Sequence, residues 1–241
     1  DPHHSASTPA LVGGGRKAAP GEISLAHNGV LFLDELPEFS RTALEALRQP
    51  LENGYITISR VNAHTVYPAK FQLIAAMNPC RCGNLGNPAL ECSRAPKCAE
   101  EYQSRLSGPL LDRIDIHIEV PAVSPWEMAA VKTGESSAAI RERVIRAREI
   151  QKQRFIELDE PQLSTNAQLR GRLLEEVTRL DKDAEELLIN FAHKNQLSAR
   201  AYHRTLRLAR TIADLQSSVN VLKIHIAEAL SYRRKLPAKT I

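Results

Sequence analysis

The chain has 241 residues, of which 43% are hydrophobic and 25% are charged, with a formal net charge of +4. This composition is typical of a globular protein with one or two domains, and the mild positive charge permits a polyanionic partner without requiring one. No apolar run reaches the roughly 18–20 residues that span a bilayer, and the start at Asp1 shows no secretion signal and no initiator Met. We therefore expect an internal fragment of a cytoplasmic protein with no membrane partner.

The first half of the chain predicts strands and short helices separated by loops. Residues 1–28 are rich in Pro and Gly, with a short helix possible near 23–27. A helix that Ser40 caps and Pro50 can kink is expected over 41–53. Further along, the pattern predicts strands over 29–34, 71–77 and 114–120, a hairpin over 55–67 and a short helix near 100–106.

The second half of the chain has a helical pattern. Helices are predicted at about 137–157, 167–179, 182–195, 199–216 and 220–232. Pro121 and Pro125 mark the change of pattern. We therefore expect an α/β domain over residues 1–121 and an all-helical domain over residues 122–241.

The run from Gly29 to Leu36 indicates a ligand site. Its four consecutive large apolar residues predict a strand covered on both faces, as in a parallel sheet, and Asp34 and Glu35 follow at once. Open α/β sheets bind ligands at the carboxyl ends of their strands. At a nucleotide site Asp34 would hold the waters of a Mg²⁺ ion and Glu35 would orient an attacking water. The alternative is a buried strand followed by two solvated acids.

Asn78 and Arg113 extend this interpretation. Asn78 ends the second buried strand, so parallel pairing would place it at the same edge as Asp34, where an amide can hold a water near a γ-phosphate. The alternative is an ordinary Asn-Pro turn. Arg113 precedes the strand predicted at 114–120 and is either an arginine finger or one half of a surface ion pair with Asp112 or Asp115.

Arg200 lies in the first turn of a predicted helix that Ser198 can cap. A cation is unfavourable there by roughly 0.3–1 kcal/mol, and a bound anion such as a phosphate would remove the penalty. The alternative is a tolerated surface arginine.

The loop Gly13–Gly15 continues into Arg16 and Lys17 but lacks the G-x-x-x-x-G-K-[ST] spacing of a phosphate-binding loop, which occurs nowhere in the chain. A mobile basic loop can contact a nucleic-acid backbone or can be a plain linker. Arg60 and His64, near the hairpin tip, admit the same two interpretations.

The four cysteines, Cys80, Cys82, Cys92 and Cys98, follow the pattern C-x-C-x₉-C-x₅-C. Thiols gathered in one loop of a chain without a secretion signal favour a Zn²⁺ site over disulfides, and the alternative is reduced thiols without metal. The adjacent pair His3 and His4 is only a weak indication of a metal site.

Several longer stretches carry a resemblance to a known family: PHHSAS (2–7), LVGGG (11–15), PGEISLAH (20–27), GVLFLDEL (29–36), AAMNPC (75–80), SGPLLDRID (107–115) and ARTIADL (209–215). Together they resemble the AAA+ ATPases, in particular the magnesium-chelatase-like ATPases of the ComM (YifB) type, over nearly the whole chain. The resemblance implies an α/β fold: a partial AAA+ P-loop core with a parallel sheet, followed by an all-helical lid domain.

The resemblance also implies roles by position. Asp34 and Glu35 look like the Walker B acids, Asn78 like the first sensor, and Arg200 like the second sensor. Arg113 looks like an arginine finger that reaches the ATP of a neighbouring subunit. ATP and Mg²⁺ are the implied cofactors, a hexameric ring is the implied assembly, and DNA is the implied partner, remodelled by branch migration during natural transformation. The glycine loop and the hairpin resemble elements that face the central pore.

Two departures from the family pattern leave alternatives open. The Walker A segment is missing, so this chain alone is not expected to bind or hydrolyse ATP. The cysteine loop has Arg81 where the family usually has Pro. One alternative is a motor that drives metal insertion into a porphyrin, as magnesium chelatases do. The other is a non-catalytic, zinc-stabilised binding module.

Overall fold

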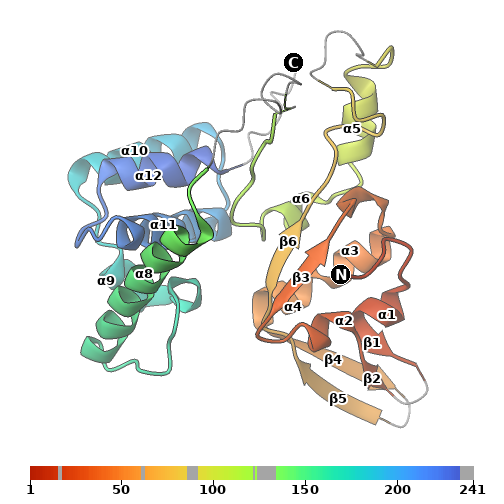
Figure 1. Cartoon of the computed structure of the whole chain (residues 1–241), viewed down its shortest axis with the longest axis horizontal. Coiled ribbons are helices and arrows are strands. Elements are labelled where there is room, and N and C mark those ends of the chain that lie inside the picture. Colours follow the sequence, from red (N-terminus) through yellow and green to blue (C-terminus); the bar gives the residue numbers. More distant parts are fainter. Residues whose placement is uncertain (16–17, 61–62, 86–91, 122, 124–133, 234–241) are drawn as a thin grey trace. The chain divides into compact units, whose positions relative to one another are not determined.

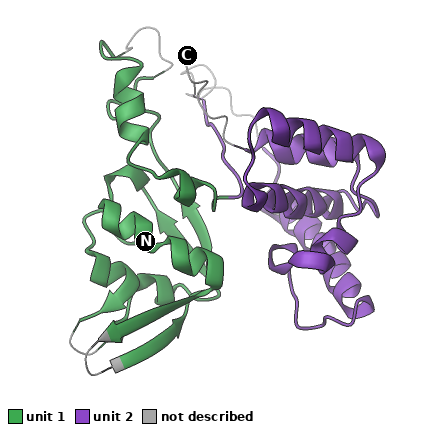
Figure 2. Ribbon diagram, turned by 180° about the vertical axis from the view of Figure 1, so that it is seen from behind, with its two compact units in different colours: residues 1–114 green, residues 115–241 purple. Residues whose placement is uncertain are grey.

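The computed structural model describes residues 1–15, 18–60, 63–85, 92–121, 123 and 134–233. The chain divides into two compact units, residues 1–114 and residues 115–241 (Figure 2). Each unit has its own hydrophobic core, and the mixed α/β character of the first and the helical character of the second agree with the predicted fold class.

The first unit combines short strands with short helices (Figure 1). Its strands are β1 (Gly13–Gly14), β2 (Ala19–Pro20), β3 (Val30–Leu33), β4 (Tyr55–Arg60), β5 (Ala63–Pro68) and β6 (Gln72–Ala75). Its helices are α1 (Thr8–Val12), α2 (Glu22–Leu25), the 3-10 turn η1 (Leu36–Glu38), α3 (Arg41–Ala46), α4 (Arg48–Asn53), α5 (Lys97–Gln103) and α6 (Gly108–Leu111). The strands pair in three two-stranded sheets, of which β3–β6 is parallel.

The β3–β6 pair buries one face and exposes the other. Leu31 and Leu33 point into the core formed with α1 to α3, whereas Val30 and Ile74, on the opposite face, are 54% and 44% exposed. The prediction of a strand covered on both faces is therefore wrong for this structure. The run of four apolar residues specified the strand but not its neighbours, and Phe32, on the same face as Val30, is only half-buried.

Two local predictions in this unit have different outcomes. The hairpin is confirmed, because β4 and β5 pair antiparallel from Tyr55 opposite Pro68 to Arg60 opposite Ala63. The single helix predicted over 41–53 is instead two helices, α3 and α4, which meet at Leu47. Pro50 has no N–H to donate to the carbonyl of Ala46, so the helical hydrogen bonding is interrupted where α3 ends.

The second unit is a helical bundle, and Figure 1 shows α10, α11 and α12 lying roughly alongside one another. Its elements are α8 (Ser137–Glu157), η2 (Asn166–Gln168), α9 (Gly171–Val177), α10 (Lys182–Lys194), α11 (Ala199–Leu215) and α12 (Lys223–Ser231). Phe155, Leu188, Ala209 and Ile226 are fully buried in its core.

Residues 114–120 form no strand, which corrects the prediction made from their alternating apolar pattern. Ile118 and Val120 are exposed, and the backbone N–H of His117 donates to the carbonyl of Tyr232 at the end of the bundle, 2.9 Å away. A strand needs a partner strand, and none of the described strands pairs with this segment.

Candidate functional site

The parallel pairing of β3 and β6 brings Asp34 and Asn78 to one edge of the sheet. Leu33 is opposite Ala75 in the register, so Asp34 follows the end of β3 and Asn78 lies three residues past the end of β6. Two backbone hydrogen bonds continue the pairing beyond the strands: Ala76 N–H donates to Leu33 O and Leu36 N–H donates to Ala76 O, each at 3.0 Å. Both polar side chains are on exposed residues, as ligand contact requires.

Glu35 is held in an uncommon backbone conformation at this edge. Its φ of 50° lies in the left-handed region, which residues with a side chain seldom adopt. Its N–H donates to Asp34 Oδ1 at 2.8 Å, and the residues that follow, Leu36 and Pro37, are buried. The Glu35 side chain remains 49% exposed.

His4 contacts this acid and was not identified as a site residue from sequence. Its Nδ1 lies 2.9 Å from Glu35 Oε2. The two residues are far apart in the sequence and no local pattern connects them. The only available signal was that the His pair begins one of the stretches that carry the family resemblance.

Arg113 is tied to its own unit. Its Nε lies 3.2 Å from Glu52 Oε2 at the end of α4, and its Nη1 donates to the carbonyl of Pro109 at 2.7 Å. The side chain is only 9% exposed. Sequence reasoning offered Asp112 or Asp115 as the ion-pair partner, but the carboxylate at 3.2 Å belongs to Glu52, and Asp115 pairs with Arg204 at 2.6 Å.

The other proposed nucleotide and nucleic-acid residues lie elsewhere. Arg200 is exposed in the first turn of α11, whose N-terminus Ser198 caps through a hydrogen bond from Ala201 N–H at 3.2 Å. His64 is exposed on β5, opposite Ser59. Arg16, Lys17 and the side chain of Arg60 lie outside the described part of the structure.

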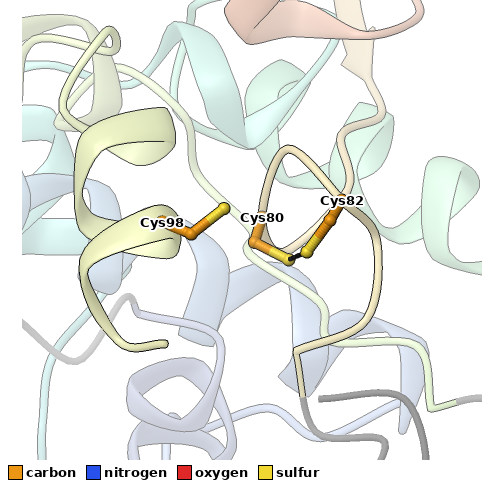
Figure 3. A group of neighbouring side chains, drawn as sticks. All are labelled: Cys80, Cys82 and Cys98. Atoms are coloured by element: carbon orange, nitrogen blue, oxygen red, sulfur yellow. Dashed lines mark hydrogen bonds between the residues drawn. The ribbon is translucent and has the colours of Figure 1, made fainter. Parts of the chain in front are cut away.

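Three of the four cysteines form a cluster (Figure 3). The sulfurs of Cys80, Cys82 and Cys98 lie within 4.8 Å of one another, and the first two are 3.2 Å apart. Cys80 and Cys82 come from the turn after β6, and Cys98 comes from the start of α5. The fourth, Cys92, is half-buried and is not part of this close group, and all four are free thiols.

The thiols of the cluster differ in acidity. Burial raises the pKa of Cys80, but the Cys82 thiol and nearby backbone N–H groups outweigh it, so the pKa falls below its usual value. The N–H of Asn84 lowers the pKa of Cys82, yet the Cys80 thiol, burial and the other two thiols raise it to about 11. The N–H of Arg94 and the Cys82 thiol lower the pKa of Cys92. This is the pattern of thiols sharing protons at close range, and a cation among them would displace those protons.

The cysteine cluster is joined to the acidic edge by α5. Gln103 Nε2 donates to the carbonyl of Pro79, between Asn78 and Cys80, at 2.9 Å. Tyr102 is buried, and its pKa is raised by that burial and then by Glu38 and Glu35. Cys80 itself follows Asn78 by two residues. The position of the Asn78 side-chain amide therefore depends on how the cysteine loop is held.

The helical unit contains a buried ion cluster that sequence reasoning missed. Asp214 is 1% exposed and accepts hydrogen bonds from Arg154, Arg210 and Asn166. Burial lowers the pKa of Arg210 and Asp214 opposes that effect. The spacing of Arg210 and Asp214, one helical turn apart within an apolar stripe, was the available signal.

Two family models match the chain, and together they cover most of both compact units. Residues 1–128 match "Magnesium chelatase, subunit ChlI", and residues 134–233 match "Magnesium chelatase, subunit ChlI C-terminal". The chain belongs to the magnesium chelatase subunit ChlI family.

Individual relatives refine this assignment. The chain is 51% identical over 234 residues to the competence protein ComM of Haemophilus influenzae and 47% identical over 234 residues to YifB of Escherichia coli. Each alignment covers 96% of this chain but 44% of the relative, so the chain spans less than half of their length. It is 25% identical over 114 residues to the magnesium-chelatase subunit ChlI of Bigelowiella natans, which covers 47% of this chain and 25% of that protein. These likenesses confirm the resemblance to magnesium-chelatase-like proteins of the ComM/YifB type.

Among the described residues, no helix combines the length and the apolar character needed to cross a membrane.

Proposed function

We propose that this chain is part of a Mg²⁺-dependent AAA+ ATPase that uses ATP hydrolysis to remodel DNA. The observation that carries the proposal is the parallel β3–β6 register, which puts Asp34, Glu35 and Asn78 at one edge of the sheet. Two carboxylates and an amide at the carboxyl ends of neighbouring parallel strands match what phosphoryl transfer to water requires.

Each residue has a separate part in this chemistry. Asp34, with its exposed carboxylate, fits as the group that holds the waters of Mg²⁺, an ion that neutralises phosphate charge when bound. Glu35 orients the water that attacks the γ-phosphorus in line, and Asn78 helps to hold that water. Arg200 would contact the phosphates from the helical unit, which we propose acts as the lid.

Arg113 would stabilise the transition state in a neighbouring subunit. To do so it must exchange Glu52, 3.2 Å away, for a phosphate. An arginine serves here because its guanidinium stays charged and matches phosphate oxygens in a fork geometry. The proposed assembly is therefore a ring in which each active site is completed by the next protomer, and six protomers are the number that the AAA+ resemblance favours.

The cysteine cluster fits a structural Zn²⁺ ion. Four thiolates around zinc at about 2.3 Å place the sulfurs roughly 3.8 Å apart. The sulfurs of Cys80, Cys82 and Cys98 already lie within 4.8 Å of one another, and Cys92 would approach them as the fourth ligand. All four cysteines would be ligands, and the ion would fix the loop that begins two residues after Asn78.

The DNA partner is the least direct part of the proposal. The basic loop at Arg16 and Lys17 and the hairpin residues Arg60 and His64 would contact the phosphate backbone. A relative of 51% identity is named a competence protein, which supports a partner of this kind over a porphyrin.

The decisive experiment replaces Glu35 by Gln in the full-length protein. Because a positioned general base contributes about 10²–10⁴-fold, kcat for ATP should fall by that factor while ATP binding persists. Glu38→Gln is the matched control, since that acid lies three residues away and pairs with Arg105 at 2.9 Å. Substantial turnover by the Glu35 variant would rule out the assigned role.

A second candidate function is a motor that drives metal insertion into a porphyrin, and it is favoured by the family descriptions, which name magnesium chelatase. Stimulation of ATP hydrolysis by DNA separates the two, since a porphyrin-directed motor predicts no stimulation. A non-catalytic, zinc-stabilised module, the third candidate, predicts stoichiometric zinc without any ATP turnover.

A further inference from the structure

The contact between His4 and Glu35 has no part in the chemistry described above. His4 Nδ1 lies 2.9 Å from Glu35 Oε2, within hydrogen-bond distance, although the two residues are far apart in the sequence. Glu35 is the residue to which the attacking water is assigned. A group that contacts its carboxylate can therefore control the direction in which that carboxylate points.

The backbone on the histidine side of this contact is well anchored. Ala6 N–H donates to His3 O at 2.9 Å, which closes a turn around His4. Ser7 then caps α1, and α1 is fixed in the core by Leu11, which is 1% exposed. The ring centroids of His3 and His4 are 4.1 Å apart.

The backbone on the glutamate side is equally constrained. Leu33 ends β3 in the core, Glu35 N–H donates to Asp34 Oδ1, and Leu36 N–H donates to Ala76 O. The Glu35 side chain, 49% exposed, can still rotate. A hydrogen bond from a fixed neighbour is what would restrict it.

The chemistry of the contact sets its direction. An ionised carboxylate only accepts, so His4 can donate to Oε2 across this 2.9 Å contact only when its Nδ1 carries a proton. The carboxylate keeps a second oxygen, Oε1, with which it can accept from a water. A neutral imidazole protonated on Nδ1 meets this requirement, and so does an imidazolium.

We propose that His4 is the positioning residue of the hydrolytic water: it holds Oε2 of Glu35 so that Oε1 faces the γ-phosphate. This proposal rests on the ATPase function proposed above. His4 itself does not contact the nucleotide. Its loss therefore affects the step in which the water attacks and leaves ATP binding unchanged.

The test compares His4→Ala with His4→Asn in the full-length protein. Misplacement of a catalytic group by about 1 Å costs up to roughly 100-fold, so kcat of the alanine variant should fall about 10- to 100-fold while KM for ATP stays within about twofold. Asn places an amide N–H close to where His4 has Nδ1, and it should restore kcat to within about tenfold of the wild type. Combining His4→Ala with Glu35→Gln should give no further loss, because both changes act through one carboxylate.

His3→Ala is the matched control, because His3 is the same residue type in the same loop and its Nδ1 lies 2.8 Å from Ser5 Oγ instead of the acid. An unchanged kcat in His4→Ala would overturn the proposal, as would an equal loss in the His4→Ala and His4→Asn variants or an equal loss in His3→Ala. Failure of the ATPase function gives a different result: the wild type does not turn over ATP, or Glu35→Gln retains turnover.

Discussion

The chain contains two kinds of carboxylate site, one in each unit, and they are satisfied in opposite ways. Asp214 is 1% exposed and surrounded by donors from Arg154, Arg210 and Asn166. Asp34 and Glu35 lie at an exposed sheet edge, where Asp34 accepts from the N–H of Glu35 and Glu35 contacts His4. A carboxylate whose oxygens are all occupied by protein donors is a structural element. One whose oxygens remain accessible can hold a metal ion or a water.

The largest predicted effect comes from a substitution in the buried ion cluster around Asp214. Asp214→Asn removes the negative charge between two arginines and leaves Arg210, whose side chain is 2% exposed, without its counter-charge. Removing one partner of a buried pair costs about 3–5 kcal/mol, and we expect that loss in the unfolding free energy measured by urea denaturation.

Asp34→Asn is the matched change at the open site. The asparagine keeps Oδ1, which accepts from Glu35 N–H, and residue 34 is exposed. The unfolding free energy should therefore change by no more than about 0.5 kcal/mol. A loss as large as that of Asp214→Asn would show that the exposed acids are structural and would remove the contrast between the two sites.

The cysteine cluster is less buried than Asp214 and less open than Asp34 and Glu35. The prediction for it concerns metal content. Its sulfurs are close together, yet only Cys80 is buried. Cys80→Ser should abolish stoichiometric zinc, measured by atomic absorption, because three ligands close the site poorly. Ser104→Ala, on the same stretch of chain, should retain the metal. Full zinc content in the Cys80→Ser variant would contradict a Cys₄ site.

The sequence predicted β3 to β6 and the longer helices because their patterns are local, whereas the short elements β1, β2 and α1 were not predicted. It also placed Asp34 and Asn78 at one edge, because parallel strands share a carboxyl end. It could not identify His4 beside Glu35 or Glu52 beside Arg113, since those contacts join distant segments whose meeting depends on packing of the core. It was wrong about residues 114–120 for the same reason: alternation predicts a strand, but pairing requires a neighbour that the pattern does not specify.

The smallest predicted effect is a pH dependence of the unfolding free energy caused by His225. This histidine belongs to the same helical unit as the buried ion cluster. Its Nδ1 accepts from Leu222 N–H at 2.9 Å and its Nε2 lies 3.0 Å from Gln216 Oε1, so both ring nitrogens are used by the neutral form. Burial and then Arg210 lower the pKa of His225 below the usual value of about 6.5. The unfolded chain therefore binds the proton more readily than the folded one. This contribution to stability is complete above about pH 6.5 and is lost as the pH falls through the lower, folded pKa.

We expect the unfolding free energy of the wild type to fall more steeply between pH 7 and 5 than that of His225→Gln, by less than about 1 kcal/mol. Equal slopes would show that the histidine is accessible to protons in the folded bundle, which would weaken the distinction between a closed helical cluster and an open strand edge.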